Sequence, residues 1–482
     1  ALGQLNPVVG DVAGNVRRMK ECIGRARQAG ADLVVFGELS VSGYPPRDLV
    51  RKRRFVADNV AAVESLAASC RGVAALVGFV RPAPTTAGRP LQNAAALLAD
   101  GRVLAVHVKS LLPTYDVFDE TRYFEPGPPG EPLPVAGRKL GVSICEDLWD
   151  AEALGRDLYG DDPVARLKAA GAEVIVNMAA SPFETGKTAR REELFRRQAA
   201  RAGAPILYVN QVGGNDELIF DGGSCLIGLG GEVLARAKSF EPDLLVADVE
   251  TGGRCEHAGE PMAPLSSALK LGLRDYATKC GFRSVVLGLS GGIDSAVAAT
   301  LAADALGPRN VLALAMPSRY SSDHSLEDAR AVADALDIDF RTVPIEPAHA
   351  AYEAGLASLL AGGRSETADE NIQARVRGAI VMAASNAHGH LALATGNKSE
   401  LSVGYCTLYG DMCGGLAPIG DVLKTVVWQL ARELNAEAGR DRIPERVIRK
   451  VPSAELRPNQ TDQDSLPPYE LLDEILSRYI EG

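Results

Sequence analysis

The stretch Leu287-Gly288-Leu289-Ser290-Gly291-Gly292-Ile293-Asp294-Ser295 decides the fold of the second half of the chain. It follows an apolar run, 284–287, that predicts a buried parallel strand, and it leads into an Ala-rich segment, 296–306, with helical spacing. Close backbone approach at the glycines, free N–H groups and the helix dipole make such a turn an anion site. No Lys follows the glycines, so this is not the GxxxxGK[ST] phosphate loop; Asp294 instead offers a carboxylate through which Mg²⁺ could bridge phosphates.

The segments after this loop predict a parallel sheet. Strands are expected at 311–315, 340–343 and 391–394, with a long helix at 370–386. The carboxyl ends of parallel strands meet at one crevice, where α/β proteins bind their ligands. Thr395 and Glu400 should therefore project toward Asp294, and two carboxylates from separate loops can hold Mg²⁺ against a pyrophosphate.

The first half of the chain alternates apolar runs with Ala/Arg-rich helical segments, which predicts an α/β domain over residues 1–250. Asn15 is expected to cap its first helix. Strands are expected at 2–5, 31–36, 73–80, 140–144, 174–178 and 206–209, with hairpins around Asp100-Gly101 and Gly230-Gly231. The Gly- and Pro-rich stretch 251–264 predicts a linker to a second domain, 265–482.

Three residues of the first half stand at expected strand ends: Glu38, Lys109 and Cys145. Taken singly, a Cys there is usually a small buried hydrophobe, and a Glu or Lys a solvated charge. Together they fit covalent amide hydrolysis. Cys145 would be the nucleophile, Glu38 would take the thiol proton and pass it to leaving ammonia, and Lys109 would stabilise the thiolate and the oxyanion.

Composition bounds the class of protein. The 482 residues suffice for two or more domains, and 46% hydrophobic and 23% charged residues are usual for a soluble globular protein. The net charge of −11 argues against nucleic acid as the main partner, and the eight cysteines include no CxxC pair. Without an 18-residue apolar run or a signal peptide, we expect a cytoplasmic protein and no membrane partner. The chain starts at Ala1 within an expected strand, so we expect at least one residue before it.

The segments around these three residues resemble the signatures of the nitrilase superfamily. They are Phe36-Gly37-Glu38-Leu39, Val108-Lys109-Ser110-Leu111-Leu112-Pro113 and Ile144-Cys145-Glu146-Asp147. The resemblance covers most of residues 1–250 and implies a four-layer αββα sandwich. It also implies a second Glu at the site, Glu120, and glutamine contacts from Tyr115, Ser181 and Lys187.

The string SGGIDS, residues 290–295, resembles the pyrophosphate loop of ATP pyrophosphatases, which adenylate an acid and then amidate it. Segments 370–375, 395–400, 409–411, 423–425 and 452–456 resemble those of NAD synthetases. The implied fold is a doubly wound parallel sheet of the adenine nucleotide alpha-hydrolase type.

The same resemblance assigns ligand contacts. ATP would be held by Gly288, Ser290, Gly291, Gly292, Asp294, Ser295, Thr395, Lys424 and Ser453. Deamido-NAD⁺ would touch Asn371, Arg375 and Glu400, and Mg²⁺ would be bound by Asp294 and Glu400. Leu408 departs from the pattern, since ammonia-dependent relatives can carry a Lys for the dinucleotide there.

Together the two resemblances cover nearly the whole chain and imply the family of glutamine-dependent NAD⁺ synthetases, α/β in both halves. The expected reaction is ATP-dependent amidation of deamido-NAD⁺ to NAD⁺ through an adenylate, with ammonia from glutamine. The expected partners are these three substrates, in a homo-oligomer.

Three alternatives compete with this interpretation. A tRNA-thiolating enzyme would use the same loop, but it would need paired cysteines and a basic surface. A module without catalysis would be expected to lack Glu38, Lys109, Cys145 or Asp294. Another glutamine-dependent amidoligase, acting on a different carboxylic acid, remains the main competitor.

Overall fold

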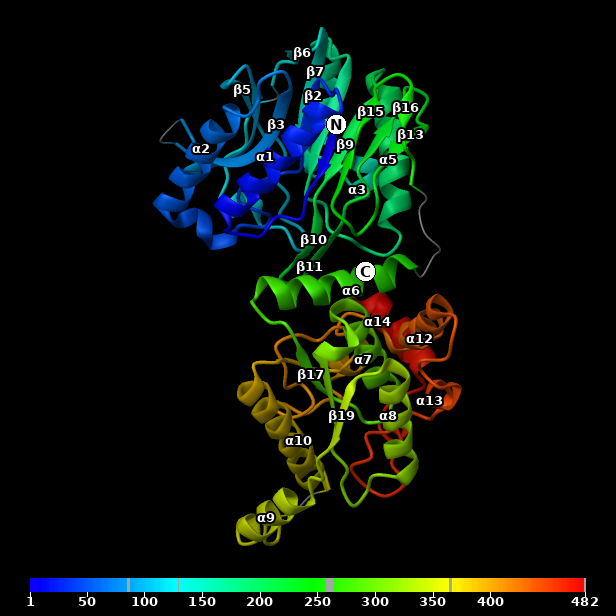
Figure 1. The fold of residues 1–482 in the computed structure, drawn as a ribbon. Coiled ribbons are helices and arrows are strands. Elements are labelled where there is room, and N and C mark those ends of the chain that lie inside the picture. Colours follow the sequence, from blue (N-terminus) through cyan, green and yellow to red (C-terminus); the bar gives the residue numbers. More distant parts are fainter. Residues whose placement is uncertain (85–86, 129, 257–262, 364–365, 481–482) are drawn as a thin grey trace. The chain divides into compact units, whose positions relative to one another are not determined.

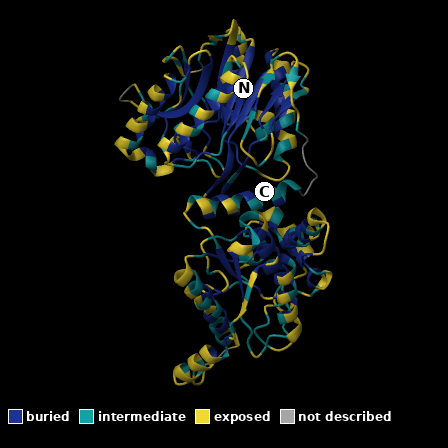
Figure 2. Ribbon diagram, in the orientation of Figure 1, coloured by how far each residue is buried: buried dark blue, intermediate teal, exposed yellow. Residues whose placement is uncertain are grey.

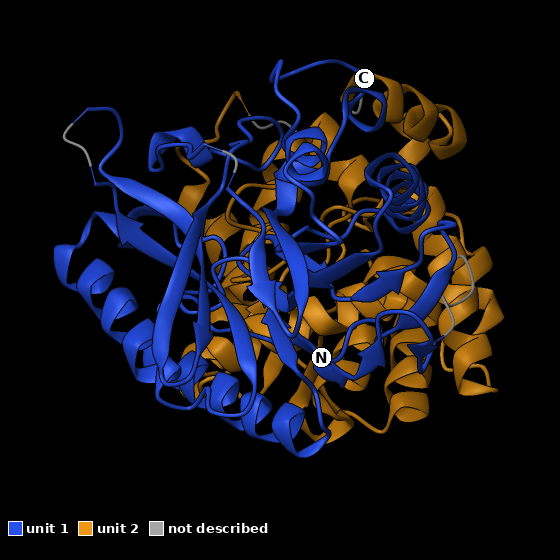
Figure 3. Cartoon of the chain, turned by 90° about the horizontal axis from the view of Figure 1, so that it is seen from above, with its two compact units in different colours: residues 1–259 blue, residues 260–482 orange. Residues whose placement is uncertain are grey.

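The computed structural model describes residues 1–84, 87–128, 130–256, 263–363 and 366–480 (Figure 1). The chain forms two compact units, Ala1–Gly259 and Glu260–Gly482 (Figure 3). Within the predicted linker, 251–264, strand β16 (Gly252–Gly253) pairs with β15 (Ala247–Asp248), and helix α6 (Ala263–Lys279) begins near its end. Residues 257–262 of that stretch lie outside the described residues.

The N-terminal unit contains two six-stranded sheets whose central strands are parallel. The first has the order β14-β1-β2-β3-β4-β5, made of β1 (Leu2–Gln4), β2 (Leu33–Phe36), β3 (Ala74–Pro82), β4 (Leu91–Ala99), β5 (Arg102–Val108) and β14 (Asp243–Leu245). The second has the order β13-β12-β9-β8-β7-β6, made of β6 (Leu133–Val135), β7 (Arg138–Ile144), β8 (Val174–Ala179), β9 (Ile206–Asn210), β12 (Cys225–Ile227) and β13 (Val233–Arg236). A separate hairpin joins β10 (Val212–Asn215) to β11 (Leu218–Asp221).

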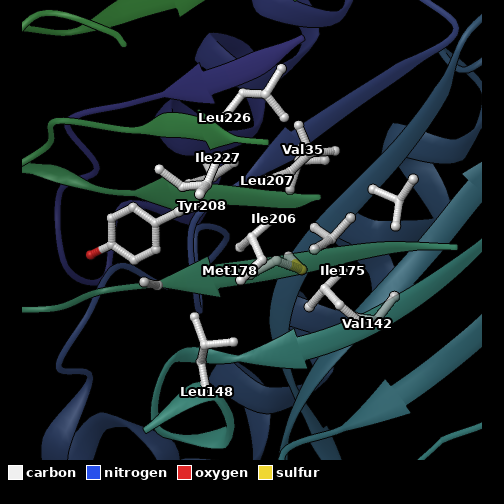
Figure 4. Packing of buried hydrophobic residues seen from close by; sticks show 14 of the residues in the cluster. Val35, Val142, Leu148, Ile175, Met178, Ile206, Leu207, Tyr208, Leu226 and Ile227 are labelled. Atoms are coloured by element: carbon white, nitrogen blue, oxygen red, sulfur yellow. The ribbon is translucent and has the colours of Figure 1, made fainter. Parts of the chain in front are cut away.

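Successive side chains along a strand point to opposite faces of the sheet, and this alternation sets the layers of the unit. Val34 and Phe36 of β2 pack with α1 (Val12–Gln28) and α2 (Arg53–Ala67), whereas Val35 joins the core between the sheets. Figure 4 shows that core, in which Val35 lies beside Leu207 of the second sheet. The second sheet is covered in turn by α4 (Pro163–Ala169) and α5 (Lys187–Ala202), while α3 (Ala151–Leu154) is a single turn. The predicted αββα sandwich is confirmed.

The predicted cap of the first helix is wrong. Helix α1 begins at Val12, and the Asp11 side chain accepts from the Gly14 N–H at 2.9 Å. Asn15 lies inside the helix, buried, where its amide exchanges hydrogen bonds with the backbone of Val8 at 2.9 Å. Both residue types suit a cap, and the backbone of the preceding loop, which pairs with Asn15, decides between them.

The C-terminal unit contains a four-stranded parallel sheet with the order β19-β18-β17-β20. Its strands are β17 (Val285–Gly288), β18 (Val311–Ala315), β19 (Asp339–Thr342) and β20 (Leu391–Leu393). Its helices after α6 are α7 (Ile293–Leu306), α8 (Asp323–Leu336), α9 (Glu346–Leu356), α10 (Glu366–His388), α11 (Lys398–Val403), α12 (Lys424–Ala438), α13 (Glu445–Arg449) and α14 (Tyr469–Ile480).

Both faces of this sheet are covered, and β17, β18 and β20 are largely buried, whereas the edge strand β19 is mostly exposed (Figure 2). Leu287 packs with α7 on one face, whereas Val286 packs with Val381 of α10 on the other. The doubly wound sheet is confirmed, and β17 and β20 lie side by side at the point where the strand order reverses. Within the described part of the chain, every helix is too short or too polar to cross a bilayer.

Candidate active sites

A buried lysine organises the candidate site of the N-terminal unit. Lys109 follows β5, and its Nζ donates to Glu38 Oε1 at 2.7 Å and to Glu120 Oε1 at 2.8 Å. The Lys109 and Glu38 side chains are 0% exposed and that of Glu120 is 5% exposed. Burial alone would lower the pKa of Lys109, but the charges of Glu120 and Glu38 raise it well above its usual value. Lys109 therefore stays an ammonium ion.

Two further donors fix the carboxylates. Asn93 Nδ2 donates to Glu38 Oε1 at 2.6 Å, and the Tyr44 hydroxyl donates to Glu120 Oε1 at 2.9 Å. The second oxygen of each carboxylate, Oε2, is buried without a hydrogen-bond partner. Burial raises the pKa of Glu120 to about 7, with Lys109 opposing the shift. The site thus presents two unpaired acceptor oxygens.

Cys145 directly follows β7 and adopts φ +46°, a left-handed backbone conformation that is uncommon for residues other than glycine. Asn177 Nδ2 donates to the Cys145 carbonyl at 3.2 Å. Burial raises the pKa of the buried Cys145 thiol, the Glu38 charge raises it further, and the Lys109 ammonium opposes both. The thiol is therefore protonated at rest and needs a base.

The other side chains predicted to contact glutamine lie near residues flanking Cys145 or near the end of β8. The Tyr115 hydroxyl donates to both oxygens of Glu146 at 3.0 Å. Lys187 Nζ lies 5.9 Å from the centroid of the Trp149 ring, and burial lowers the pKa of Lys187. Ser181 is buried after β8, with its N–H bonded to Asn210 Oδ1 at 2.8 Å.

Sequence reasoning missed Glu146 and Tyr159 here. The Tyr159 hydroxyl donates to Glu146 Oε1 at 2.8 Å, so two phenols hold one buried carboxylate. Burial raises the pKa of Glu146, and both phenols oppose the shift. Its place directly after Cys145 was the available signal, whereas nothing in the sequence indicated Tyr159.

In the C-terminal unit, the glycine loop runs from β17 into α7. Gly291 has φ +82°, and a Cβ there would lie 2.2 Å from the carbonyl oxygen of Ser325 in α8, so only glycine fits. Gly292 is the N-cap residue of α7, and its N–H donates to Ser290 Oγ at 3.2 Å. Ser295 Oγ donates back to the Gly292 carbonyl at 3.0 Å. This turn brings backbone N–H groups and a helix N-terminus together, as an anion site requires.

A second buried lysine joins the carboxylates around this loop. Lys424 Nζ bonds Asp294 Oδ2 at 2.5 Å and Glu400 Oε1 at 3.3 Å, and Asn397 Nδ2 donates to Asp294 Oδ1 at 2.9 Å. Burial and the Asp294 charge raise the pKa of Glu400 to about 7, while Lys424 opposes the shift. The expected approach of Glu400 to Asp294, from loops after β20 and β17, is present in the structure.

The loop borders a cavity of about 310 Å³. It is lined by most of the residues predicted to bind ATP and by the two predicted metal ligands, namely Gly288, Ser290, Gly292, Asp294, Ser295, Thr395, Glu400, Lys424 and Ser453. Asn371 and Arg375 do not line it. They bond the neighbouring loop instead, Asn371 Oδ1 accepting from Thr407 Oγ1 at 2.7 Å and Arg375 Nε donating to the Leu408 carbonyl at 3.2 Å.

Two cationic side chains at this cavity were missed. Arg377 lines it and donates from Nε to the Met316 carbonyl at 3.0 Å, and burial lowers the pKa of Arg377 to about 10. Lys450 lines it as well, with Nζ 2.5 Å from Ser325 Oγ. The helical spacing of Ala374, Gly378 and Val381 would have placed Arg377 on the buried face of α10.

Residues 1–254 match the Carbon-nitrogen hydrolase family, and residues 265–482 match the NAD synthase family. The chain is 46% identical to the glutamine-dependent NAD(+) synthetase of Synechocystis sp., over all of this chain and 88% of that protein. It is 45% identical to the Xanthomonas campestris enzyme of the same name, over all of this chain and 87% of that protein. The solved structure of the glutamine-dependent NAD+ synthetase from Acinetobacter baumannii, in complex with ADP, is 38% identical, with a TM-score of 0.87 over 100% of this chain and 87% of that one.

Full-length identity at this level, with both halves matched in order, favours this family over a different amidoligase or a thiolating enzyme. The chain belongs to the family of glutamine-dependent NAD⁺ synthetases.

Proposed function

We propose that the N-terminal unit hydrolyses glutamine at Cys145 and that the C-terminal unit uses the ammonia to amidate deamido-NAD⁺ after its activation by ATP. One observation carries this division of labour. Each unit holds its own buried lysine between two carboxylates, Lys109 beside Cys145 in one and Lys424 beside the glycine loop in the other. Each arrangement suits one half of the reaction.

In the N-terminal unit, Glu38 is the general base. Its Oε1 is occupied by Lys109 and Asn93, so the unpaired Oε2 is the oxygen that takes the thiol proton from Cys145. The sulfur then attacks the carboxamide carbon of glutamine. Glu38 returns the proton to the departing nitrogen, which leaves as ammonia and yields a thioester on Cys145. Water hydrolyses the thioester to glutamate.

The Lys109 ammonium has three N–H donors, and the two carboxylates use two of them. The third can stabilise the oxyanion that forms when sulfur attacks the carbonyl. We assign Glu120 to orienting the carboxamide, and Tyr115, Ser181 and Lys187 to holding the rest of the glutamine molecule.

In the C-terminal unit, the nicotinate carboxylate of deamido-NAD⁺ attacks the α-phosphorus of ATP. Pyrophosphate departs, and ammonia then displaces AMP from the adenylate to form the amide. Activation is needed because a carboxylate anion is a poor electrophile. The N-terminus of α7 at the end of the glycine loop, together with Lys424, would stabilise the departing pyrophosphate. Thr395 and Ser453 line the same cavity and would contact ATP.

The residues around Lys424 fit Mg²⁺. Asp294 and Glu400 both contact the ammonium nitrogen of Lys424, so the two carboxylates already converge on one cation beside the glycine loop. Mg²⁺ prefers such carboxylate oxygens and, when bound, would offset the negative charge of the pyrophosphate. We propose these two side chains as its protein ligands.

We propose that deamido-NAD⁺ extends from Glu400 and Arg377 in the cavity toward the loop at residues 407–410. Thr407 and Gly410 line the cavity, and Asn371 holds Thr407 from outside it. Asn371 and Arg375 would then act on the dinucleotide at, or through, this loop.

The test supplies purified protein with ATP, Mg²⁺ and deamido-NAD⁺, and with either glutamine or an ammonium salt. NAD⁺, AMP and pyrophosphate are expected with both nitrogen donors. Cys145→Ala should lose synthesis from glutamine and keep synthesis from ammonium. Release of ADP and phosphate, or loss of both activities in a folded variant, would contradict the proposal.

A further inference from the structure

Helix α14 (Tyr469–Ile480) lies against the two helices that carry Glu400 and Lys424, and it is far from both in sequence. Its residue Asp473 is 4% exposed and follows Ser399 by 74 residues. Asp473 Oδ1 accepts from Ser399 Oγ at 2.5 Å, and Asp473 Oδ2 accepts from the backbone and side chain of Thr425 at 2.8 and 2.7 Å. One buried carboxylate therefore ties together α11 and α12.

The contact with Thr425 is a helix cap supplied from outside the helix. Leu423, the N-cap residue of α12, offers no side-chain acceptor, so the first turn of α12 needs one from elsewhere. Asp473 provides this acceptor, and its negative charge is favourable at the positive end of the helix dipole. The first residue of that helix is Lys424.

The contact with Ser399 completes the link. Ser399 immediately precedes Glu400, and its Oγ also accepts from the Lys424 N–H at 2.8 Å. The chain Asp473–Ser399–Lys424 thus fixes the backbones from which the Glu400 and Lys424 side chains reach each other. Tyr469, one turn earlier on α14, lies with its ring centroid 5.3 Å from Lys424 Nζ.

Tyr469 adds a second attachment. Its hydroxyl donates to the buried Asp462 Oδ2 at 2.8 Å, and Asp462 lines the cavity. Its ring packs edge-on against Trp428 of α12 at a centroid distance of 6.0 Å. Helix α14 is therefore linked to cavity-lining residues in two ways. Tyr469 bonds Asp462, and Asp473 bonds the neighbours of Glu400 and Lys424.

We infer that Asp473 is a positioning residue of the ATP site. It acts through Ser399 and Thr425, and it holds the side chains of Glu400 and Lys424 in place beside Asp294. The inference rests on the proposed roles of Lys424 and Glu400. Asp473 does not line the cavity, so its effect must pass through those two side chains.

The test measures ammonium-driven NAD⁺ synthesis by the full chain. Asp473→Ala should lower kcat by roughly 10–100-fold, the usual cost of removing a partner that orients a ligand side chain. Asp473→Asn keeps one acceptor for Thr425 and should recover part of the loss. Glu474→Gln is the matched control, because Glu474 is exposed on the same helix and pairs only with Arg478 among the described residues. The control should keep the wild-type kcat.

A double-mutant cycle separates positioning from general destabilisation. If Asp473 acts through Lys424, Asp473→Ala should cost much less when Lys424→Ala is already present. Wild-type kcat in Asp473→Ala, or a loss that persists undiminished in the Lys424→Ala background, would overturn the inference alone. Wild-type kcat in Lys424→Ala would overturn the proposed function and the inference with it.

Discussion

Replacing Lys109 by Met tests the charge arrangement at the glutaminase site. Met fills a similar volume but leaves the carboxylates of Glu38 and Glu120 buried without a cation. Breaking a buried ion pair from one side costs about 3–5 kcal/mol, and here the lysine contacts two carboxylates at 2.7 and 2.8 Å. We expect the N-terminal unit to lose stability in this range at pH 8, together with all glutamine hydrolysis.

The loss should shrink as the pH falls. The raised pKa of Lys109 means that its contribution is fully present below its usual pKa of 10.5, hence throughout pH 5–8. In the variant, the pKa of Glu120 rises further because Lys109 no longer opposes the effect of burial, so the folded unit binds a proton more readily than the unfolded chain. A proton then substitutes for the missing cation. The free energy of unfolding of the variant should therefore differ from that of the wild type by less at pH 5 than at pH 8, by at least about 1 kcal/mol.

The assay is urea unfolding followed by tryptophan fluorescence. The chain has two tryptophans, Trp149 and Trp428, so a Trp428→Phe background confines the signal to the N-terminal unit. Lys20→Met, which removes a half-buried lysine whose Nζ donates only to Ser65 Oγ among the described residues, is the control and should change stability little. A decrease in the free energy of unfolding of less than about 1 kcal/mol at pH 8, or a decrease that does not depend on pH, would refute the reasoning.

Further variants probe the remaining features. Asp294→Ala should remove NAD⁺ synthesis with either nitrogen donor while glutamine hydrolysis survives; the exposed Asp334→Ala serves as control, and retained ammonium-driven synthesis would reject Asp294 as a ligand. Gly291→Ala should weaken ATP binding measured by calorimetry and destabilise the C-terminal unit by about 1–3 kcal/mol, because φ +82° and the Ser325 carbonyl exclude a Cβ; unchanged binding and stability would contradict this. Removal of Mg²⁺ with a chelator should stop synthesis and spare glutamine hydrolysis, and continued synthesis would argue against the metal.

Local patterns predicted the elements whose signals are short and strong. The apolar run 311–315 is β18 with the same bounds, and the loop at 288–295 joins a strand to a helix as expected. The three residues at strand ends, Glu38, Lys109 and Cys145, do surround one buried centre. Such predictions succeed because strand ends and glycine turns are set by neighbours in sequence.

Contacts between distant segments were not predictable in this way. Arg377 and Lys450 reach the cavity from α10 and from the loop after α13, and no spacing in the sequence joins those elements. Asn15 failed as a cap because its amide pairs with the backbone of Val8 and Val41, a contact that only the folded loop provides. Tyr159 meets Glu146 across an irregular segment for the same reason.

The unpaired Oε2 atoms of Glu38 and Glu120 give the glutaminase site a preference that extends to its product. A carboxamide offers N–H groups to these two oxygens, whereas an ester of the same shape offers none. Once the amide is cleaved, the new carboxylate of glutamate lies opposite the same acceptors and is repelled by them. Electrostatic expulsion of glutamate would empty the pocket for the next turnover and make the enzyme tolerant of high glutamate concentrations. Below pH 7, where Glu120 gains a proton, that expulsion would weaken and glutamate would become a better inhibitor.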